Sequence, residues 1–256
     1  MALAVCTWNL FHGRSRPGTN ADLVTDFAAA LAAREWDVCG LQESPPWWTR
    51  ELAQALGASA RSARTSWVRA AAPGWQERTH RQDPERLGVK GAGANVLLVR
   101  PSAGEIVDER QSTVRWLPQR RSVHAVRLRR PDGSHWWVAN VHTHNKPESQ
   151  AARDTIRTLA TVAAWAGDEP TVVLGDLNLA APQGLVRVEG WEHLHGHRVD
   201  HIVARGLRPA GGSLASAGAY AEIAWLRPGV ELADHHVVGL SVDVVGTHAA
   251  PAPQGN

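Results

Sequence analysis

The sequence TVVLGDLN, at residues 171–178, decides the fold of this chain. Its first four residues are β-branched or apolar, which is typical of a short buried strand. Asp176 and Asn178 follow that run directly, so a carboxylate and a carboxamide emerge together at the carboxyl end of the strand. Active sites collect at this position in layered α/β folds, because the strands of such a sheet deliver their ends to a shared crevice.

Polar residues also lie at the ends of other strand-like runs along the chain. One such position means little, but several that converge on one cleft indicate a metal-assisted hydrolase. The further positions are Asn9 after residues 4–8, Glu43 after 38–42, His142 after 136–141, and Asp234 with His235 before 237–240.

Length and composition indicate one globular domain. The chain has 256 residues, 43% of them hydrophobic, and no long Gly/Ser- or Pro-rich linker divides it, so we expect a single domain over residues 1–245. Residues 246–256 offer little to bury, and we expect a disordered tail. The net charge is +2, and of the 27 basic residues only Lys90 and Lys146 are lysines. The arginine excess is read as a coding bias, so only local clusters of arginine carry information.

The cysteines and the amino-terminal sequence indicate the cellular compartment of the protein. Cys6 and Cys39 lie in apolar runs without partners at zinc spacing, so they indicate buried thiols and no disulfide framework. No basic region followed by a signal-length apolar stretch opens the chain, and no run is long enough to span a membrane. The expectation is a soluble, cytoplasmic protein without a membrane partner.

Hydrophobic periodicity predicts the elements in outline. Strands outnumber helices, and hairpins mix with crossovers, which predicts two mixed sheets packed together with outer helices. We expect helices over 20–34, 48–56 and 149–165. We expect strands that end at residues 8, 43 and 174, and strands over 94–99, 198–204 and 237–244. Residues 123–129 and 136–142 should form a hairpin, and residues 61–93 a short strand with a long surface loop.

The polar strand ends suit a hard divalent cation. Asn9, Glu43, Asp176, Asn178 and Asp234 all present oxygen, the ligand atom that such ions prefer. The chain has no cysteine cluster and no His-Glu-x-x-His spacing, so Mg²⁺ or Mn²⁺ is favoured over a structural zinc ion. Each residue also has a structural interpretation, since Asx residues commonly form turns after strands. The combination of these residues favours a functional site over a structural role in turns.

Read in order, five short motifs resemble those of the endonuclease/exonuclease/phosphatase superfamily, which has the deoxyribonuclease I-like fold. The resemblance implies an α+β, four-layered sandwich of two mixed β-sheets flanked by helices. The motifs are TWNL at 7–10, LQE at 41–43, GDLN at 175–178, VDHI at 199–202 and ADH at 233–235.

The resemblance also implies roles for the metal-binding and water-activating residues. Glu43 corresponds to the principal metal ligand, with Asn9 beside it, and Asp234 adds charge directly or through water. Asp176 corresponds to the residue that orients and deprotonates the attacking water, and Asn178 to the residue that positions this water or the phosphate.

Further residues correspond to phosphate contacts. His235 matches the histidine that touches the scissile phosphate, and Asp200 matches the carboxylate that fixes its tautomer. His142 and Asn145 match positions on the opposite wall. Arg121 matches a basic residue near the same oxygens, although a solvated strand arginine is an equally good interpretation.

The sequence departs from the family pattern at two places. Ala233 stands where the last motif usually has serine, without the proline that commonly follows. Phe11 stands where some DNA-repair members carry an acidic residue. The resemblance therefore stops at the superfamily.

Three functions remain open. The first is a divalent-metal-dependent phosphodiesterase acting on DNA, RNA or a nucleotide. The second is a phosphatase or phosphodiesterase for lipid or inositol phosphates, and the third is an inactive binding module on the same fold. Lipid-cleaving relatives tend to carry an export signal and an apolar hairpin, and neither is visible in the sequence. The arginines and tryptophans of residues 61–93 fit either a solvated loop or a substrate wall.

Overall fold

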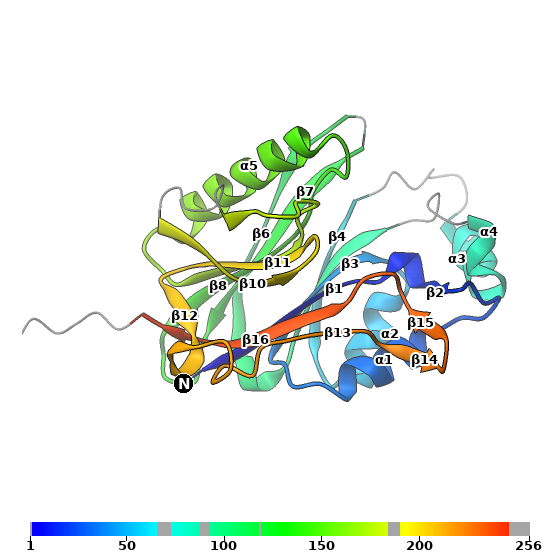
Figure 1. The fold of residues 1–256 in the computed structure, drawn as a ribbon, viewed down its shortest axis with the longest axis horizontal. Coiled ribbons are helices and arrows are strands. Elements are labelled where there is room, and N and C mark those ends of the chain that lie inside the picture. The colour runs from blue at the N-terminus through cyan, green and yellow to red at the C-terminus, as the bar shows by residue number, and fades with distance from the viewer. Residues whose placement is uncertain (1, 66–72, 88–92, 118, 184–189, 246–256) are drawn as a thin grey trace, which may run out of the picture.

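Two large β-sheets pack face to face and form the centre of the protein (Figure 1). The computed structural model describes residues 2–65, 73–87, 93–117, 119–183 and 190–245, so the predicted tail lies outside the described residues. In the first sheet the strand order is β12-β16-β1-β3-β5-β4, and β13 also pairs with β16. Its strands are β1 (Leu3–Asn9), β3 (Val38–Ser44), β4 (Ser59–Arg64), β5 (Ala94–Val99), β12 (Leu207–Pro209), β13 (Tyr220–Glu222) and β16 (Val237–Val244).

The second sheet has the order β10-β11-β9-β8-β7-β6, and a small third sheet has the order β14-β15-β2. The strands of the second sheet are β6 (Glu105–Arg115), β7 (Arg121–Arg129), β8 (His135–His142), β9 (Thr171–Asp176), β10 (Trp191–His197) and β11 (Asp200–Arg205). Those of the third are β2 (Ser15–Arg16), β14 (Trp225–Arg227) and β15 (Val230–Leu232).

The two large sheets share one topological feature that positions the site, a pair of parallel strands. In the described part of the chain, each contains a single parallel pair, β1 with β3 and β8 with β9, and its other pairings are antiparallel. The crossovers contain helices α1 (Val24–Ala32) and α5 (Glu148–Ala166). Parallel strands end at the same edge of a sheet. Asn9 and His142 therefore close strands next to those that carry Glu43 and Asp176.

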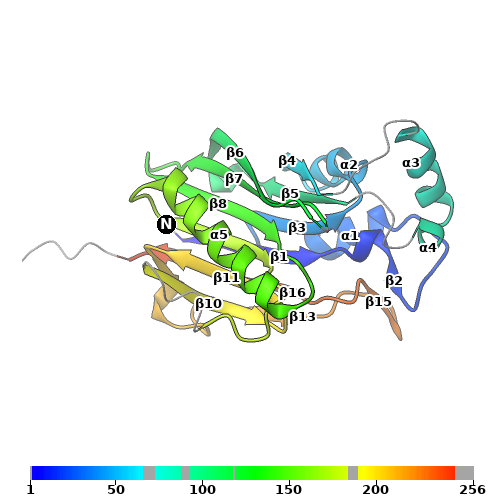
Figure 2. The ribbon, with the colours of Figure 1, turned by 90° about the horizontal axis from the view of Figure 1, so that it is seen from above.

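Three apolar clusters hold the layers together. One lies between the two sheets and includes Val5, Val138 and Leu174. A second packs the first sheet against α1 and α2 (Trp48–Ala55), and a third packs α5 on the second sheet. The order helix, sheet, sheet, helix is visible in Figures 1 and 2. The predicted four-layered α+β sandwich is thus confirmed.

A buried polar network crosses the interface between the sheets below the site. The Asn140 carboxamide of β8 donates to the carbonyl oxygens of Leu41 and Val96 in the first sheet, at 2.8 and 2.9 Å. Its Oδ1 accepts a hydrogen bond from Gln42 Nε2 at 2.7 Å. Buried amides satisfied in this way favour one relative placement of two surfaces, because a shifted sheet would leave polar groups unpaired.

Several predicted elements need correction. Residues 61–93, expected as a short strand and a long loop, contain the end of β4 and two helices, α3 (Pro73–Gln82) and α4 (Pro84–Leu87). The helix predicted from residue 20 begins only at Val24. In α5, Ile156 is 47% exposed and lies outside the buried face, which runs through Thr155, Thr158 and Leu159.

Candidate active site

The paired strand ends bring side chains from both sheets to one end of the sandwich. Asn9 of β1 lies against Asp176 of β9, and Glu43 of β3 lies near His142 of β8. Each of these contacts joins a residue of one sheet to a residue of the other. The site therefore forms only when the two sheets pack.

Asp176 is the buried carboxylate at the centre. Its Oδ2 accepts a hydrogen bond from Asn9 Nδ2 at 3.0 Å, and its Oδ1 accepts one from the backbone N–H of Asn178, also at 3.0 Å. His142 Nε2 lies 3.5 Å from Oδ2. Burial raises the pKa of Asp176, although the charge of His235 and the two hydrogen bonds oppose that shift. A carboxylate with a raised pKa is a better proton acceptor than an exposed one.

The backbone around Asp176 explains the glycine before it and the asparagine after it. A Cβ on Gly175 would lie 2.0 Å from the carbonyl oxygen of Val141, so only glycine fits between β9 and β8. Asn178 has a φ of +50°, a conformation that asparagine tolerates better than most residues. Its Nδ2 donates to the carbonyl oxygen of Thr143 at 3.2 Å, which ties the loop after β9 to the end of β8.

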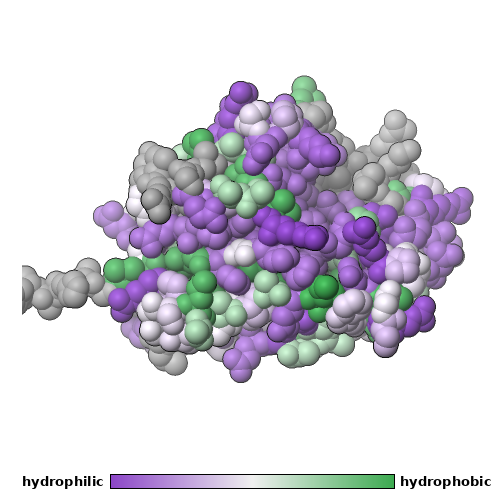
Figure 3. All heavy atoms as spheres, in the orientation of Figure 1, coloured by the Kyte–Doolittle hydropathy of each residue, from purple (hydrophilic) through white to green (hydrophobic). Residues whose placement is uncertain are grey.

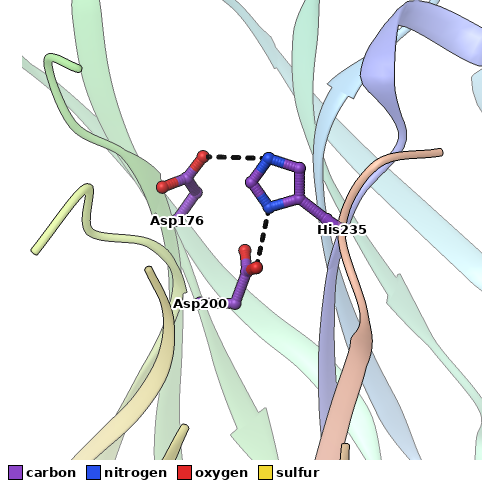
Figure 4. A group of neighbouring side chains, drawn as sticks. All are labelled: Asp176, Asp200 and His235. Carbon is purple, nitrogen blue, oxygen red and sulfur yellow. Dashed lines mark hydrogen bonds and ion pairs between the residues drawn. The ribbon is translucent and has the colours of Figure 1, made fainter. Parts of the chain in front are cut away.

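His235 reaches the site from the loop before β16. Its Nδ1 and Asp200 Oδ2 are 2.7 Å apart and form a hydrogen bond (Figure 4). The opposite ring nitrogen, Nε2, lies 4.0 Å from Asp176 Oδ2 and 3.7 Å from Asp234 Oδ1. Trp8 Nε1 donates to the carbonyl oxygen of His235 at 3.1 Å and so fixes the loop. Asp200 thereby directs Nε2 toward the centre of the site.

The acids around His235 favour its charged form. Burial disfavours the imidazolium, but the hydrogen bond to Asp200 and the charges of Asp176 and Asp234 outweigh it and raise the pKa of His235. At neutral pH the ring is a cation that presents an N–H group beside Asp176. This arrangement can bind an anionic oxygen such as that of a phosphate.

Glu43 sits on an irregularity of β3. The pairing of β3 with β5 shifts register between Leu41 and Ser44, and Glu43 has a φ of +50°. Bulges of this kind redirect a side chain at the edge of an active site. The Glu43 carboxylate oxygens lie 3.2 Å from His12 Nε2 and 3.8 Å from His142 Nδ1.

The charges near Glu43 fit a divalent cation. Burial and the neighbouring Asp176 raise the pKa of Glu43 to about 7, because both disfavour the charged carboxylate. Asn9 Oδ1 accepts one hydrogen bond, from the Phe11 N–H at 3.0 Å, and an amide oxygen has a second lone pair. Asp234 Oδ1 is buried without a hydrogen-bond partner among the described residues. Glu43, Asn9 and Asp234 are therefore oxygen donors available to an ion.

A second group could also hold a metal by distance alone. Donor atoms of Asp176, Asp200 and His235 all lie within 4.8 Å of one another. However, the Asp200 carboxylate is buried and its Oδ2 forms a short hydrogen bond with His235 Nδ1. This group is therefore a hydrogen-bonded network, whereas the Glu43 side chain is 24% exposed and accessible to an ion.

Arg121 and Asn145 differ in how they relate to the site. Arg121, the first residue of β7, is buried, and its Nη2 donates to Gln119 Oε1 at 2.9 Å. Burial lowers its pKa, and the charges of Glu43 and Asp176 oppose that shift. The charges of the two carboxylates thus act on Arg121. Asn145 lies in the loop after β8 and is exposed, and the described hydrogen bonds and ion pairs do not join it to the other site residues.

Two histidines near Glu43 carried no signal in the sequence. His12 lies in the short turn after β1, and burial together with the charge of Arg14 lowers its pKa to about 4. His80 of α3 contacts the carbonyl oxygen of His12 through Nε2 at 2.7 Å. The position of His12 three residues after Asn9 was the only available hint, because His80 meets it from 68 residues away.

An exposed hydrophobic tip lies next to Arg121. Trp116 and Leu117, in the turn between β6 and β7, are 60% and 78% exposed. The Arg120 guanidinium lies 5.4 Å from the centre of the Trp116 ring. Two adjacent apolar residues are too short a run to indicate an apolar hairpin from the sequence.

A comparison with protein-family models now identifies the family. The model described as "Endonuclease/Exonuclease/phosphatase family" matches residues 6–235, which include all the site residues above. The chain belongs to the endonuclease/exonuclease/phosphatase family. This membership supports phosphoesterase activity. A search of curated proteins found no match.

Solved structures share the fold of this family member at low sequence identity. An endonuclease/exonuclease/phosphatase from Beutenbergia cavernae has a TM-score of 0.67 and 16% identity, over 97% of this chain and 73% of that one. Humanized D. rerio TDP2 has a TM-score of 0.67 and 15% identity, over 95% and 99%. The human Nocturnin catalytic domain, solved with a bound sulfate anion, has a TM-score of 0.67 and 14% identity, over 95% and 94%. Among the described helices of our structure, none is long and apolar enough to cross a bilayer.

Proposed function

We propose that this protein is a divalent-metal-dependent phosphodiesterase that cleaves nucleic acid or a nucleotide-like substrate by in-line attack of water. The observation that carries the proposal is the 4.0 Å separation of His235 Nε2 from Asp176 Oδ2. A proton acceptor and a cationic donor thus border the same space, beside a carboxylate suited to a metal. This combination matches the demands of phosphoester hydrolysis.

The chain's own groups have distinct tasks in this reaction. Asp176 orients a water molecule and accepts its proton while the water oxygen bonds to phosphorus and the leaving oxygen departs. His235 donates a hydrogen bond to a phosphate oxygen, and Asp200 holds its ring in place. Arg121 adds positive charge from β7. When bound at Glu43, Asn9 and Asp234, the cation neutralises negative charge that develops on oxygen.

The wall formed by α3 supports a nucleic-acid substrate. Trp75 and Arg78 lie three residues apart in α3 and both are exposed, so they share one helix face. An aromatic ring beside a guanidinium suits a base and its phosphate. His80 of the same helix contacts the His12 carbonyl oxygen, so α3 lies beside the turn that carries His12.

A direct test is hydrolysis of bis-p-nitrophenyl phosphate with Mg²⁺, Mn²⁺ or EDTA. We expect metal-dependent turnover that His235→Ala lowers by about 10²- to 10³-fold, as for loss of a hydrogen-bond donor to the transition state. His197→Ala is the matched control, because the described ring contacts of His197 are with His236, outside the cluster. Absence of metal-dependent turnover, both on this compound and on DNA and RNA, would favour the binding-module alternative.

A lipid or inositol phosphate is the second candidate substrate, and the exposed Trp116 and Leu117 favour it. Against it, the face in Figure 3 is mostly hydrophilic, with apolar side chains in scattered patches. Cosedimentation with phosphoinositide-containing vesicles, compared with phosphatidylcholine vesicles, separates the two candidates. Binding that is lost in Trp116→Ala, together with headgroup hydrolysis, would replace the nucleic-acid proposal.

A further inference from the structure

The contact between His12 and Glu43 has an unusual geometry. His12 Nε2 and Glu43 Oε2 are 3.2 Å apart, close enough for a hydrogen bond. Nevertheless, the hydrogen bonds of the described residues do not include this pair, so the ring nitrogen does not point head-on at the carboxylate oxygen. The two atoms lie side by side instead.

Two donor atoms that lie side by side are arranged like adjacent ligands of one metal ion. Two ligand atoms, each about 2.1 Å from an octahedral cation, lie about 3 Å apart when adjacent. The 3.2 Å separation fits this spacing. The other Glu43 oxygen lies 3.8 Å from His142 Nδ1, so imidazole nitrogens flank both oxygens of the carboxylate.

The backbone holds His12 in this place. His12 has a φ of +56°, which is uncommon for a residue with a side chain. The contact of His80 Nε2 with its carbonyl oxygen anchors this conformation from α3. The side chain of His12 is only 12% exposed and therefore has little freedom to turn away from Glu43. Strain retained beside an active site is a reason to look for a function.

We propose that His12 is a nitrogen ligand of the cation held by Glu43, and that it makes the site selective for Mn²⁺ over Mg²⁺. This inference rests on the proposed function. Mg²⁺ prefers oxygen ligands, whereas imidazole binds the first-row transition metals more strongly. A site built of oxygens alone would lack that preference. His12 thus sets which divalent cation the protein selects.

The test uses the full chain stripped of metal with a chelator. Titration calorimetry with Mn²⁺ and with Mg²⁺ gives two dissociation constants for the wild type and for His12→Gln. The glutamine replaces an imidazole nitrogen by an amide group of similar reach. We expect the wild type to bind Mn²⁺ at least about tenfold more tightly than Mg²⁺, and the substitution to abolish most of that ratio. A folding defect would weaken both ions equally.

Pulsed electron paramagnetic resonance of the Mn²⁺ complex supplies an independent readout. Coupling of the electron spin to ¹⁴N should be present in the wild type, be lost or strongly reduced in His12→Gln, and persist in His142→Gln. His197→Gln controls for loss of a histidine elsewhere. Wild-type Mn²⁺ binding without ¹⁴N coupling, or coupling unchanged in His12→Gln, overturns the role of His12 while leaving the proposed function intact. Absence of Mn²⁺ binding would overturn both.

Discussion

Burial and neighbouring charge set the ionisation of each site residue. Burial raises the pKa of Asp176 and of Glu43, and three neighbouring carboxylates raise the pKa of His235. These shifts favour the protonated form of each group. Ordinary side chains thus acquire perturbed pKa values through their surroundings, which is typical of functional sites.

Asp200→Asn tests the positioning of His235. The asparagine keeps the shape but loses the charge that supports the imidazolium, so we expect kcat to fall by about 10²- to 10⁴-fold. Mn²⁺ affinity should change little, because the described contacts of Asp200 do not include Glu43. Steady-state kinetics and calorimetry measure the two quantities. A kcat within about twofold of the wild type would remove this role from Asp200.

Glu43→Gln tests the buried carboxylate through pH. Its pKa is about 7 in the folded chain against an ordinary value of 4.5, so the folded state retains a proton that the unfolded state releases between these values. Stability from this group therefore declines as pH rises from 4.5 and is lost above 7. Without metal, the variant should melt a few degrees above the wild type near pH 8 and equally near pH 4. A pH-independent difference in Tm would contradict the raised pKa.

At the level of secondary-structure elements, the local sequence pattern and the tertiary structure do not always agree. Helix α1 begins at Val24, four residues later than the pattern predicts. The Asp22 carboxylate just before it accepts hydrogen bonds from the Val24 N–H at 3.4 Å, from Trp48 Nε1 at 3.1 Å and from Arg81 Nη1 at 2.7 Å. One side chain thus joins the start of α1 to α2 and α3, and a local pattern does not encode these contacts.

Asn140→Leu tests the network that sets the relation of the two sheets. The substitution removes the hydrogen bonds that the Asn140 amide donates to the carbonyl oxygens of Leu41 and Val96, and the one that it accepts from Gln42 Nε2, within the core. We expect a loss of about 1–3 kcal/mol in the free energy of unfolding and a lower kcat. Urea denaturation measures the first quantity. Gln111→Leu, at an exposed position of β6, is the control and should change stability by less than about 0.5 kcal/mol. Equal effects of the two substitutions would refute the role of the network.

At the scale of the whole molecule, segments that are far apart in the sequence meet beside the site. The turn that carries His12 depends on α3, because His80 of this helix contacts the His12 carbonyl and packs edge-on against the rings of Trp47 and Trp48. Arg81 fixes the same helix through ion pairs with residues near α1 and in α2. Helix α3 is thus docked on the domain beside His12 and is not an independent surface loop.

Arg81→Ala tests this docking. Arg81 pairs with Asp22 at 2.7 Å and Glu51 at 2.5 Å, and losing such a network costs roughly 1 kcal/mol. We expect about fivefold faster proteolysis within residues 59–93 and a higher KM for a nucleic-acid substrate, with kcat on small phosphodiesters preserved. Arg208→Ala, an exposed arginine of β12, is the control. An unchanged cleavage rate would show that the ion pairs do not hold α3.

The sequence by itself determined the layered fold and the chemical character of the site. Apolar runs closed by polar residues specify strands and their ends locally, so two mixed sheets with outer helices followed from the pattern, and the family resemblance implied the four-layered sandwich. Helix α5, expected over residues 149–165, spans Glu148–Ala166 for the same reason. The oxygen-bearing side chains at 9, 43, 176 and 234 were visible because each directly adjoins an apolar run.

Only the tertiary structure decided which side chains meet. His12 approaches Glu43, and His80 approaches His12, across separations of 31 and 68 residues that no local periodicity encodes. Helices α3 and α4 escaped detection because they lack a regular apolar stripe, and their contacts with the domain are largely polar. Likewise, the pKa of Glu43 depends on burial between two sheets. Burial and long-range contact are properties of the packed chain, so they exist only once the sheets have assembled.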